Sequence, residues 1–300
     1  MKKEFLALAA VTALVTAAHA QQNTALSQLI DPSDINVSVP AASLPARGGV
    51  VTAVANPWDP AAPFSYNQLP AQVFHAGGAA SVRNVRSGPV PADHKSYKWE
   101  TVTVNAARIA KVLYGYRLYG TGHSFLVFIF NEGGAVDARG QNVRALTFGA
   151  EAWSREPYGF TLSHALLGRY PLIWVATTFE SYTDYIAVAK KKDTFFKALA
   201  LGPEQNMRLF RLLLARVDET NRNRETYNLF NNSCTNNPVD LINQVIPAAA
   251  RISLDVAGLM NPYASIPRFA VQKYTANGVL TGEAFRLGAD NAGAFDVNKI

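Results

Sequence analysis

Residues 121–130 read TGHSFLVFIF, and this stretch decides the fold. From Ser124 to Phe130 the run is dense in β-branched and aromatic side chains, which predicts a buried strand. The sequence NEGG at residues 131–134 predicts the turn that follows it. Residues 143–148 then predict a strand that pairs back on the first one.

Further elements are expected on both sides of this pair. Alternating or apolar patterns predict strands at residues 97–104, 108–118, 174–179 and 193–201. The sequence GPEQ at residues 202–205 predicts the start of a helix, which then frays in the polar run 219–224. A second helix is expected to begin near residue 234 and to run to residue 246. Together these elements predict a domain of the α+β class over residues 97–250.

The first twenty residues predict export. A basic start, an apolar core from Phe5 to Ala18 and the small-residue ending at Ala20 are the three parts of a cleavable signal peptide. The apolar run is shorter than the roughly 20 residues that a membrane-spanning helix needs. We therefore expect a mature chain that works in the periplasm or outside the cell, without a transmembrane helix.

The two ends of the mature chain are expected to be less regular. Residues 21–96 are rich in Ala and Pro, which predicts an N-terminal arm with short strands. Residues 251–300 predict an irregular C-terminal extension packed on the domain. The net charge of +6 falls to +5 when Lys2, Lys3 and Glu4 leave with the signal. This mild charge permits peripheral contact with an anionic membrane but does not indicate nucleic-acid binding.

The single cysteine is the first candidate for chemistry. Cys234 lies in NNSCTNNP at residues 231–238, a polar loop before the second helix. A helix N-terminus favours thiolate over thiol, and the thiolate is the form that attacks an acyl carbon. One cysteine and scattered histidines give no metal-ligand spacing, and no nucleotide-binding motif is present. We therefore expect neither a metal nor a cofactor.

A cysteine nucleophile usually works with a histidine base. His123 is the preferred candidate because it lies at the mouth of the buried strand, directly after Gly122, and a strand end is a rigid mount. The alternative interpretation is a histidine at the edge of the core that is satisfied by a backbone carbonyl. His164 is the reserve base or an orienting residue.

Acyl transfer needs two further kinds of group. One is a partner that holds the imidazole, for which the candidates are Thr147, Glu151 and His164. The other is a set of donors to the oxyanion, namely the backbone N–H of Cys234 together with the side chain of Asn232 or Tyr227.

Five motifs occur in a fixed order along the chain. They are GHSF at residues 122–125, LTFGA at 146–150, LLGRY at 166–170, LALGPEQ at 199–205 and YNLFNNSCT at 227–235. In this order and spacing the chain resembles the DUF4105 family, also called the Lnb N-terminal periplasmic domain. The resemblance covers about residues 105–246.

The resemblance implies a periplasmic, cysteine-dependent acyl-transfer domain. The named class moves an acyl chain from phospholipid to the amino terminus of lipoproteins. The implied fold is circularly permuted and papain-like, of the NlpC/P60 type, with an antiparallel sheet packed against helices, His123 as base and Cys234 as nucleophile. Two features depart from the family pattern. Ser233 stands where an Asn is expected directly before the cysteine, and no transmembrane portion like that of the full-length acyltransferase is expected.

Three functions compete. The first is acyl transfer or hydrolysis on a lipid-linked ester or amide of the envelope, the second is a peptidoglycan-type amidase, and the third is a non-catalytic envelope-binding protein. A long apolar groove beside Cys234 would favour lipid, and a polar open cleft would favour a wall peptide. The apolar segment 158–174 is either ordinary core or a lid that lines a groove for a hydrocarbon chain. We expect acyl groups of envelope lipids or lipopeptides to be the substrate.

Overall fold

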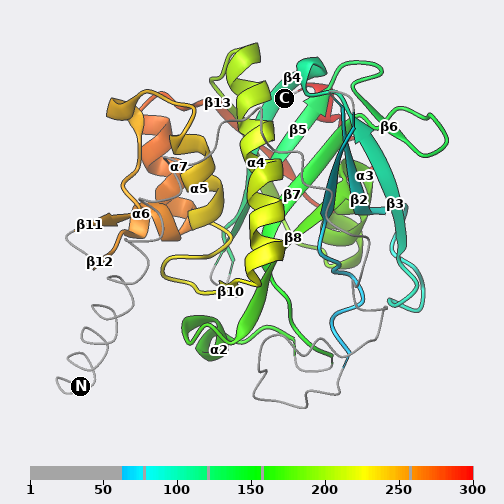
Figure 1. Ribbon diagram of the computed structural model, residues 1–300, viewed down its shortest axis with the longest axis horizontal. Coiled ribbons are helices and arrows are strands. Elements are labelled where there is room, and N and C mark those ends of the chain that lie inside the picture. The colour runs from blue at the N-terminus through cyan, green and yellow to red at the C-terminus, as the bar shows by residue number, and fades with distance from the viewer. Residues whose placement is uncertain (1–62, 77–78, 120–121, 157–158, 257–258, 300) are drawn as a thin grey trace.

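The computed structural model describes residues 63–76, 79–119, 122–156, 159–256 and 259–299. The expected signal peptide and residues 21–62 of the expected arm lie outside this part of the chain. Within it, strands and helices follow one another along the chain, and most of the strands join a single large sheet (Figure 1). The predicted α+β class is thus confirmed.

Eleven strands form an open mixed sheet. They are β1 (Gln72–Ala76), β2 (Ala79–Ser87), β3 (Lys98–Val104), β4 (Ile109–Arg117), β5 (His123–Phe130), β6 (Ala135–Asp137), β7 (Ala145–Ala152), β8 (Tyr170–Thr178), β9 (Thr194–Leu199), β10 (Thr226–Tyr227) and β13 (Leu280–Leu287). Their order is β13-β9-β4-β5-β7-β8-β2-β3-β6, with β1 on β2 and β10 on β8. The pair β2–β8 is parallel and the other pairs are antiparallel. The family resemblance implies an antiparallel sheet, and this one parallel pair departs from that expectation. The short strands β11 (Asp255–Val256) and β12 (Leu259–Met260) pair separately.

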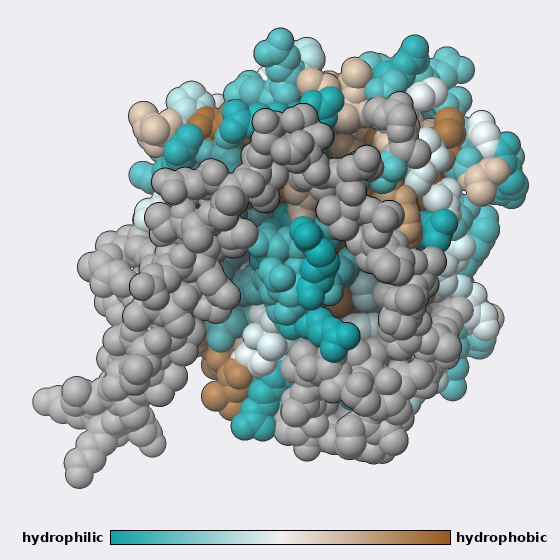
Figure 2. All heavy atoms as spheres, in the orientation of Figure 1, coloured by the Kyte–Doolittle hydropathy of each residue, from teal (hydrophilic) through white to brown (hydrophobic). Residues whose placement is uncertain are grey.

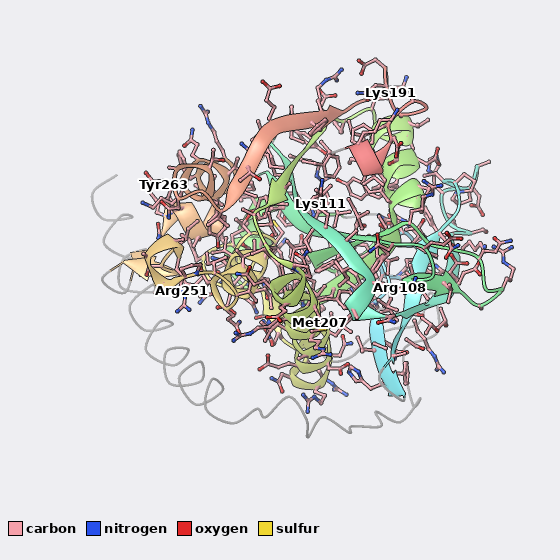
Figure 3. The ribbon with its side chains drawn as sticks, turned by 90° about the horizontal axis from the view of Figure 1, so that it is seen from above. Arg108, Lys111, Lys191, Met207, Arg251 and Tyr263 are labelled. Carbon is pink, nitrogen blue, oxygen red and sulfur yellow. The ribbon has the colours of Figure 1, made fainter. Side chains whose placement is uncertain are left out.

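Helices cover both faces of the sheet. They are α2 (Leu162–Leu166), α3 (Phe179–Thr183), the π-helix η2 (Asp184–Ala189), α4 (Pro203–Asn223), α5 (Asn236–Asn243), α6 (Pro262–Ser265) and α7 (Pro267–Ala276), with 3-10 turns η1 (Ala106–Arg108), η3 (Ala248–Ala250) and η4 (Val297–Lys299). Seen from above, Lys111 of β4 lies between Met207 of α4 and Lys191, which follows η2 (Figure 3). Helix α4 therefore packs on one face, and α3 with η2 packs on the other.

Strand β5 is buried along its whole length, as its sequence predicts. Leu126 and Phe128 face the α4 side, where Phe128 meets Phe210 of that helix edge to face, with ring centroids 4.9 Å apart. Phe125 and Val127 face the α3 side. A strand that is buried on both faces needs apolar residues at every position, which is why this run does not alternate with polar residues.

Helix α4 is longer than its sequence predicts. The polar run after residue 219 does not fray, because its side chains have tertiary partners and the helix continues to Asn223. The indole N–H of Trp174 donates to Thr220 Oγ1 at 3.2 Å, and the amide of Asn221 donates to the carbonyl of Ala71 at 2.8 Å. The outward face of α4, in the centre of Figure 2, is largely hydrophilic.

The N-terminal arm contributes more to the sheet than its composition suggests. Residues 72–76 and 79–87 form β1 and β2, and β2 pairs with β1, β3 and β8. The register shifts between Val82 and Val85, where Asn84 takes the left-handed backbone conformation with φ +58° and donates to the carbonyl of Pro70. This irregularity breaks the period of two that would have marked a long strand.

The C-terminal segment is also more regular than expected. Pro262 and Pro267 do not break structure but are the first residues of α6 and α7, a position where the missing proline N–H costs nothing. Strand β13 then closes one edge of the sheet by pairing with β9. The segment therefore packs on the domain through two helices and a strand.

Candidate active site

Three charged side chains lie in one row across three neighbouring strands. Arg117 of β4 is the cross-strand partner of His123, the first residue of β5. The β5–β7 pairing sets Leu126 against Phe148, and the same register continued to the strand end sets His123 against Glu151. His123 Nε2 lies 3.0 Å from Glu151 Oε1. We call Arg117, His123 and Glu151 the charged row.

Cys234 is held beside this row by the next residue of β5. The Ser124 hydroxyl donates to the carbonyl oxygen of Cys234 at 3.2 Å and lies 3.0 Å from Thr235 Oγ1. Thr235 is the N-cap of α5, so the cysteine stands just before that helix. Cys234 is buried, with 6% of its surface exposed. A strand residue therefore fixes the backbone of the cysteine loop.

The sulfur of Cys234 has four hydrogen-bonding neighbours. They are the imidazole of His123, the phenol of Tyr227, the backbone N–H of Ser124 and the hydroxyl of Thr235, which lies 3.9 Å away. Burial raises the pKa of the thiol. The His123 charge and the hydrogen bonds from His123, Tyr227 and Ser124 lower it by more than burial raises it, so the net pKa is about 7. A substantial fraction of Cys234 is therefore thiolate at neutral pH.

The imidazole of His123 is set by opposing influences. Burial lowers its pKa, the carboxylate of Glu151 raises it, and the guanidinium of Arg117 lowers it, with a net pKa of about 9. Because Nε2 faces Glu151, Nδ1 is the ring nitrogen that remains for the thiol. The ring also stacks on Phe125, with centroids 5.8 Å apart. Thiolate, imidazolium and carboxylate thus form one chain of alternating charge.

Tyr227 touches both the sulfur and the backbone of Cys234. Its hydroxyl donates to Sγ at 3.4 Å and accepts from the Cys234 backbone N–H at 3.4 Å. Burial and the nearby thiolate raise the pKa of this phenol well above its ordinary value, so it stays a neutral donor. Of the two side chains expected to donate to an oxyanion, Tyr227 is the one that the structure places at the thiol.

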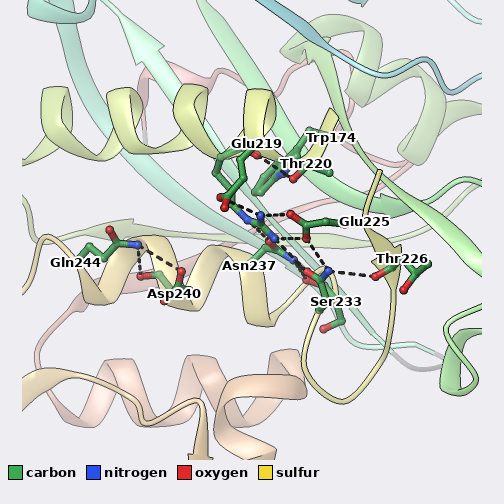
Figure 4. A network of polar contacts seen from close by, with 11 residues as sticks. Trp174, Glu219, Thr220, Glu225, Thr226, Ser233, Asn237, Asp240 and Gln244 are labelled. Atoms are coloured by element: carbon green, nitrogen blue, oxygen red, sulfur yellow. Dashed lines mark hydrogen bonds and ion pairs between the residues drawn. The ribbon is translucent and has the colours of Figure 1, made fainter. Parts of the chain in front are cut away.

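Asn232 lies in a different polar cluster, together with Glu225, Thr226 and Asn237, which are labelled in Figure 4. Its amide donates to Glu225 Oε2 at 2.8 Å and to the carbonyl of Thr226 at 3.1 Å. Arg216 joins the same cluster and donates to Glu225 and to the oxygen of Asn237. Both amide hydrogens of Asn232 are therefore used within this cluster, where the side chain ties the cysteine loop to Glu225 and Thr226.

The other two expected orienting residues have hydrogen-bonding neighbours elsewhere. The Thr147 hydroxyl pairs with that of Thr177 on the neighbouring strand. His164 lies on α2, where its Nδ1 is 2.8 Å from Thr161 Oγ1. Of the three candidates for this role, only Glu151 meets His123.

A pocket of about 140 Å³ opens beside the charged row, on the α3 face of the sheet. Its lining includes the charged row together with Arg86, Gly149 and Tyr185. We call it the sheet pocket. Cys234 does not line it, but His123, which neighbours the sulfur, does. The π-helix η2 supplies part of the cover, and π-helical segments are frequent at functional sites.

Sequence reasoning missed several side chains of this site. Arg86 falls in the segment that composition marks as an arm, and nothing in the local pattern sets it apart. Arg117 ends a predicted strand, and only its pairing with His123 brings it to the site. Ser124 looks like one polar position in an apolar run, a signal that could have been followed because a buried strand rarely accepts a hydroxyl without a partner.

The apolar segment 158–174 divides into two parts. From Tyr170 onward it is core strand β8, with Tyr170 and Trp174 fully buried. Before it, Phe160, Leu162 and Leu167 are exposed, and the Phe160 ring meets Tyr227 edge to face at 6.3 Å. The second half is ordinary core, while the exposed apolar part lies close to the cysteine site through Phe160.

Two further properties concern the described residues. Within them, no group of three or more His, Cys, Asp or Glu side chains is arranged to hold a metal ion. Likewise, no helix in that part of the chain combines the length and the apolar character needed to cross a membrane.

Comparison with known proteins gives one match. The sequence profile of the Lnb N-terminal periplasmic domain matches residues 95–268, more than half of the 300 residues. No match was found among curated proteins or among solved structures. The matched region contains Cys234, the charged row and Tyr227. The chain therefore belongs to the family of the Lnb N-terminal periplasmic domain.

Proposed function

We propose that this protein is a cysteine-dependent acyltransferase or hydrolase. Its substrate would be a lipid-linked ester or amide of the cell envelope. The observation that supports this most is the contact between the Cys234 thiol and His123, whose far nitrogen is held by Glu151. A nucleophile, a base and a group that orients the base are the three parts of a catalytic triad. A thiol before a helix, facing a histidine on an earlier strand, also fits a circularly permuted papain-like site.

The chemistry would proceed in two halves. The Cys234 thiolate attacks the acyl carbon, a C–S bond forms, and the His123 imidazolium gives its proton to the departing alcohol or amine as the C–O or C–N bond breaks. A water or amine then attacks the thioester, loses a proton to His123 and releases the thiolate. Tyr227 would donate to the oxygen that becomes negative in each half.

The envelope location is part of the proposal. The expected signal peptide would deliver the chain to the periplasm, where lipid and wall substrates both occur. The exposed apolar side chains near Tyr227 favour a lipid acyl chain. The polar lining of the sheet pocket favours the second candidate, a peptidoglycan-type amidase.

The first experiment tests for an acyl-enzyme. The purified protein is mixed with p-nitrophenyl butyrate, and a burst of nitrophenol equal to the enzyme concentration is expected, together with a thioester on Cys234 detected by mass spectrometry. Cys234→Ala and His123→Ala should lose the burst. His164→Ala is the matched control, because it removes an imidazole that does not contact Cys234, and it should keep the burst.

The second experiment separates the candidate substrates. The protein is incubated with phospholipid vesicles carrying a lipopeptide and, separately, with peptidoglycan fragments. Fatty-acid release or transfer that is absent in Cys234→Ala supports the lipid function. Cleavage of wall peptides without an effect on lipid would replace it by the amidase. A protein that shows neither reaction and no burst would be a non-catalytic binding protein.

A further inference from the structure

The sheet pocket has a floor made by two adjacent rows of the sheet. The charged row is one edge, and Gly149 lies in the next row, where the absence of a side chain leaves the pocket its depth. A Cβ at Gly149 would stand 3.1 Å from Glu151 Oε1 and 3.4 Å from His123 Nε2. Glu151 keeps 28% of its side chain exposed, so the pocket reaches solvent.

Two arginines in this pocket lack a carboxylate partner. In the described part of the chain, neither Arg86 nor Arg117 forms an ion pair within 4.0 Å. Arg86 is 3% exposed, donates to the carbonyl of Asn67 at 3.0 Å and lies over the ring of Tyr185 at 4.5 Å. A buried guanidinium without a counter-ion is costly, because the charge has left water without compensation.

Arg117 shows the same deficit at the other edge of the pocket. One terminal nitrogen donates to the hydroxyl of Tyr119 at 3.1 Å. Its Nε is buried and, among the described residues, has no hydrogen-bond partner. Glu151 is the one acidic side chain that lines the pocket, and its carboxylate is already paired with His123. One carboxylate therefore faces two guanidinium groups and an imidazolium, and this excess of positive charge favours an anionic ligand.

We propose that the sheet pocket is a phosphate-binding subsite in which Arg86 and Arg117 hold the phosphate head of the substrate. Two guanidinium groups from separate strands converge on one space, which suits the several oxygens and the charge of about −1.5 to −2 of a phosphate monoester. A carboxylate carries a single charge and is best bound by the fork of one arginine. That the phosphate belongs to the acyl substrate rests on the proposed function; the binding itself does not.

The position of the subsite gives it a consequence for substrate choice. His123 lines the pocket and also neighbours the Cys234 sulfur, so a phosphate in the pocket would anchor the substrate head beside the imidazole that faces the thiol. Lipids whose head is a phosphate monoester, such as phosphatidic acid, would then be preferred over lipids with the same acyl chains and no net charge.

The direct test is calorimetric titration of the full chain with inorganic phosphate at constant ionic strength. One saturable site is expected, with weaker binding of acetate and none of chloride. Arg117→Gln and Arg86→Gln should each weaken phosphate binding about tenfold to a hundredfold, the value of a charged hydrogen bond. Arg83→Gln is the matched control, because this exposed residue of β2 carries the same charge outside the pocket, and its affinity should equal that of the wild type.

Three further arms decide the remaining questions. Arg86→Lys keeps the positive charge but loses the planar guanidinium that can bind two phosphate oxygens. It should also weaken phosphate binding, and it replaces Arg86→Gln if that variant does not fold. Cys234→Ala should bind phosphate normally, which separates the subsite from the acyl chemistry. Phosphatidylcholine vesicles with phosphatidic acid should bind more protein than vesicles without it, and loss of this difference in Arg117→Gln assigns the site to a lipid head group.

Several results would overturn the proposal. They are the absence of a saturable phosphate site, equal affinity in wild type and both arginine variants, or tighter binding of acetate than of phosphate. The last result would indicate a carboxylate ligand such as a wall peptide. Phosphate binding without any preference for phosphatidic acid vesicles would refute the lipid head and leave a site for small phosphate esters.

Discussion

Replacing Glu151 with Gln keeps the shape of the side chain but removes the negative charge 3.0 Å from His123. This carboxylate is the strongest of the influences that raise the His123 pKa, ahead of the Cys234 thiolate, while burial and Arg117 lower that pKa. In the variant we expect a neutral imidazole at pH 7. Cys234 would then lose the cation that lowers its own pKa.

The size of the effect on the alkylation rate follows from the fraction of Cys234 that is thiolate. With a pKa of about 7, about half of Cys234 is thiolate at pH 7. A thiol with an ordinary pKa of about 8.5 is only about 3% ionised at that pH, a difference of about 2 kcal/mol in thiolate stability. Because the thiolate is the reactive form, we expect alkylation at pH 7 to slow about fifteenfold.

The assay is the rate of iodoacetamide alkylation as a function of pH. Cys234 is the single cysteine of the chain, so the rate reports one site. The half-point should move from about 7 in the wild type toward the ordinary value in Glu151→Gln. Glu180→Gln removes the same charge from an exposed position on α3 and should leave the profile unchanged. If the pH profile of Glu151→Gln coincides with that of the wild type, Glu151 does not control the ionisation of Cys234 and His123.

Three further predictions concern the same site. Tyr227→Phe removes the donor to the sulfur, so the acylation rate should fall about a hundredfold with the fold intact by circular dichroism; an unchanged rate would remove Tyr227 from the oxyanion role. Gly149→Ala should slow acylation because its Cβ would press on Glu151 and His123, and the free energy of unfolding should fall by about 1–3 kcal/mol; an acylation rate equal to that of the wild type would show that these side chains move aside. Arg216→Gln leaves Glu225 without its cation, and urea unfolding should show a loss of roughly 2–3 kcal/mol because the pair is mostly buried; no change would mean that water replaces the arginine.

Much of the fold follows from local pattern. The strands around TGHSFLVFIF and the helix that starts at Pro203 have strong signals, since apolar side chains recur with the period of each element. Strand β2 and the C-terminal elements lack such a signal, and the reason differs between them. A bulge at Asn84 interrupts the period of β2, and Pro262 and Pro267 mark helix starts that composition alone presents as breaks. The single parallel pair is a property of tertiary pairing, which local pattern does not carry.

The candidate site also contains residues that the sequence predicts and residues that it does not. Cys234, His123 and Tyr227 can be proposed from residue type and local context, and the structure brings them together. Which residue orients the imidazole depends on register across β5 and β7, and the chain alone leaves Thr147, Glu151 and His164 equal. Arg86 comes from a strand that sequence reasoning did not place in the domain, so the sheet pocket could not have been expected.

The register of β5 links the core to the chemistry. Side chains on a strand alternate between faces, so His123 points to the pocket with Phe125, while Ser124 points to α5 and holds the cysteine loop. A slip of one residue would exchange the two and break both contacts. Both faces of the strand are buried, so specific fit opposes such a slip: Phe128 packs edge to face on Phe210, and the Phe125 ring occupies the space that Gly115 leaves by having no side chain. The apolar residues that make the strand thus also hold the thiol and the imidazole in contact.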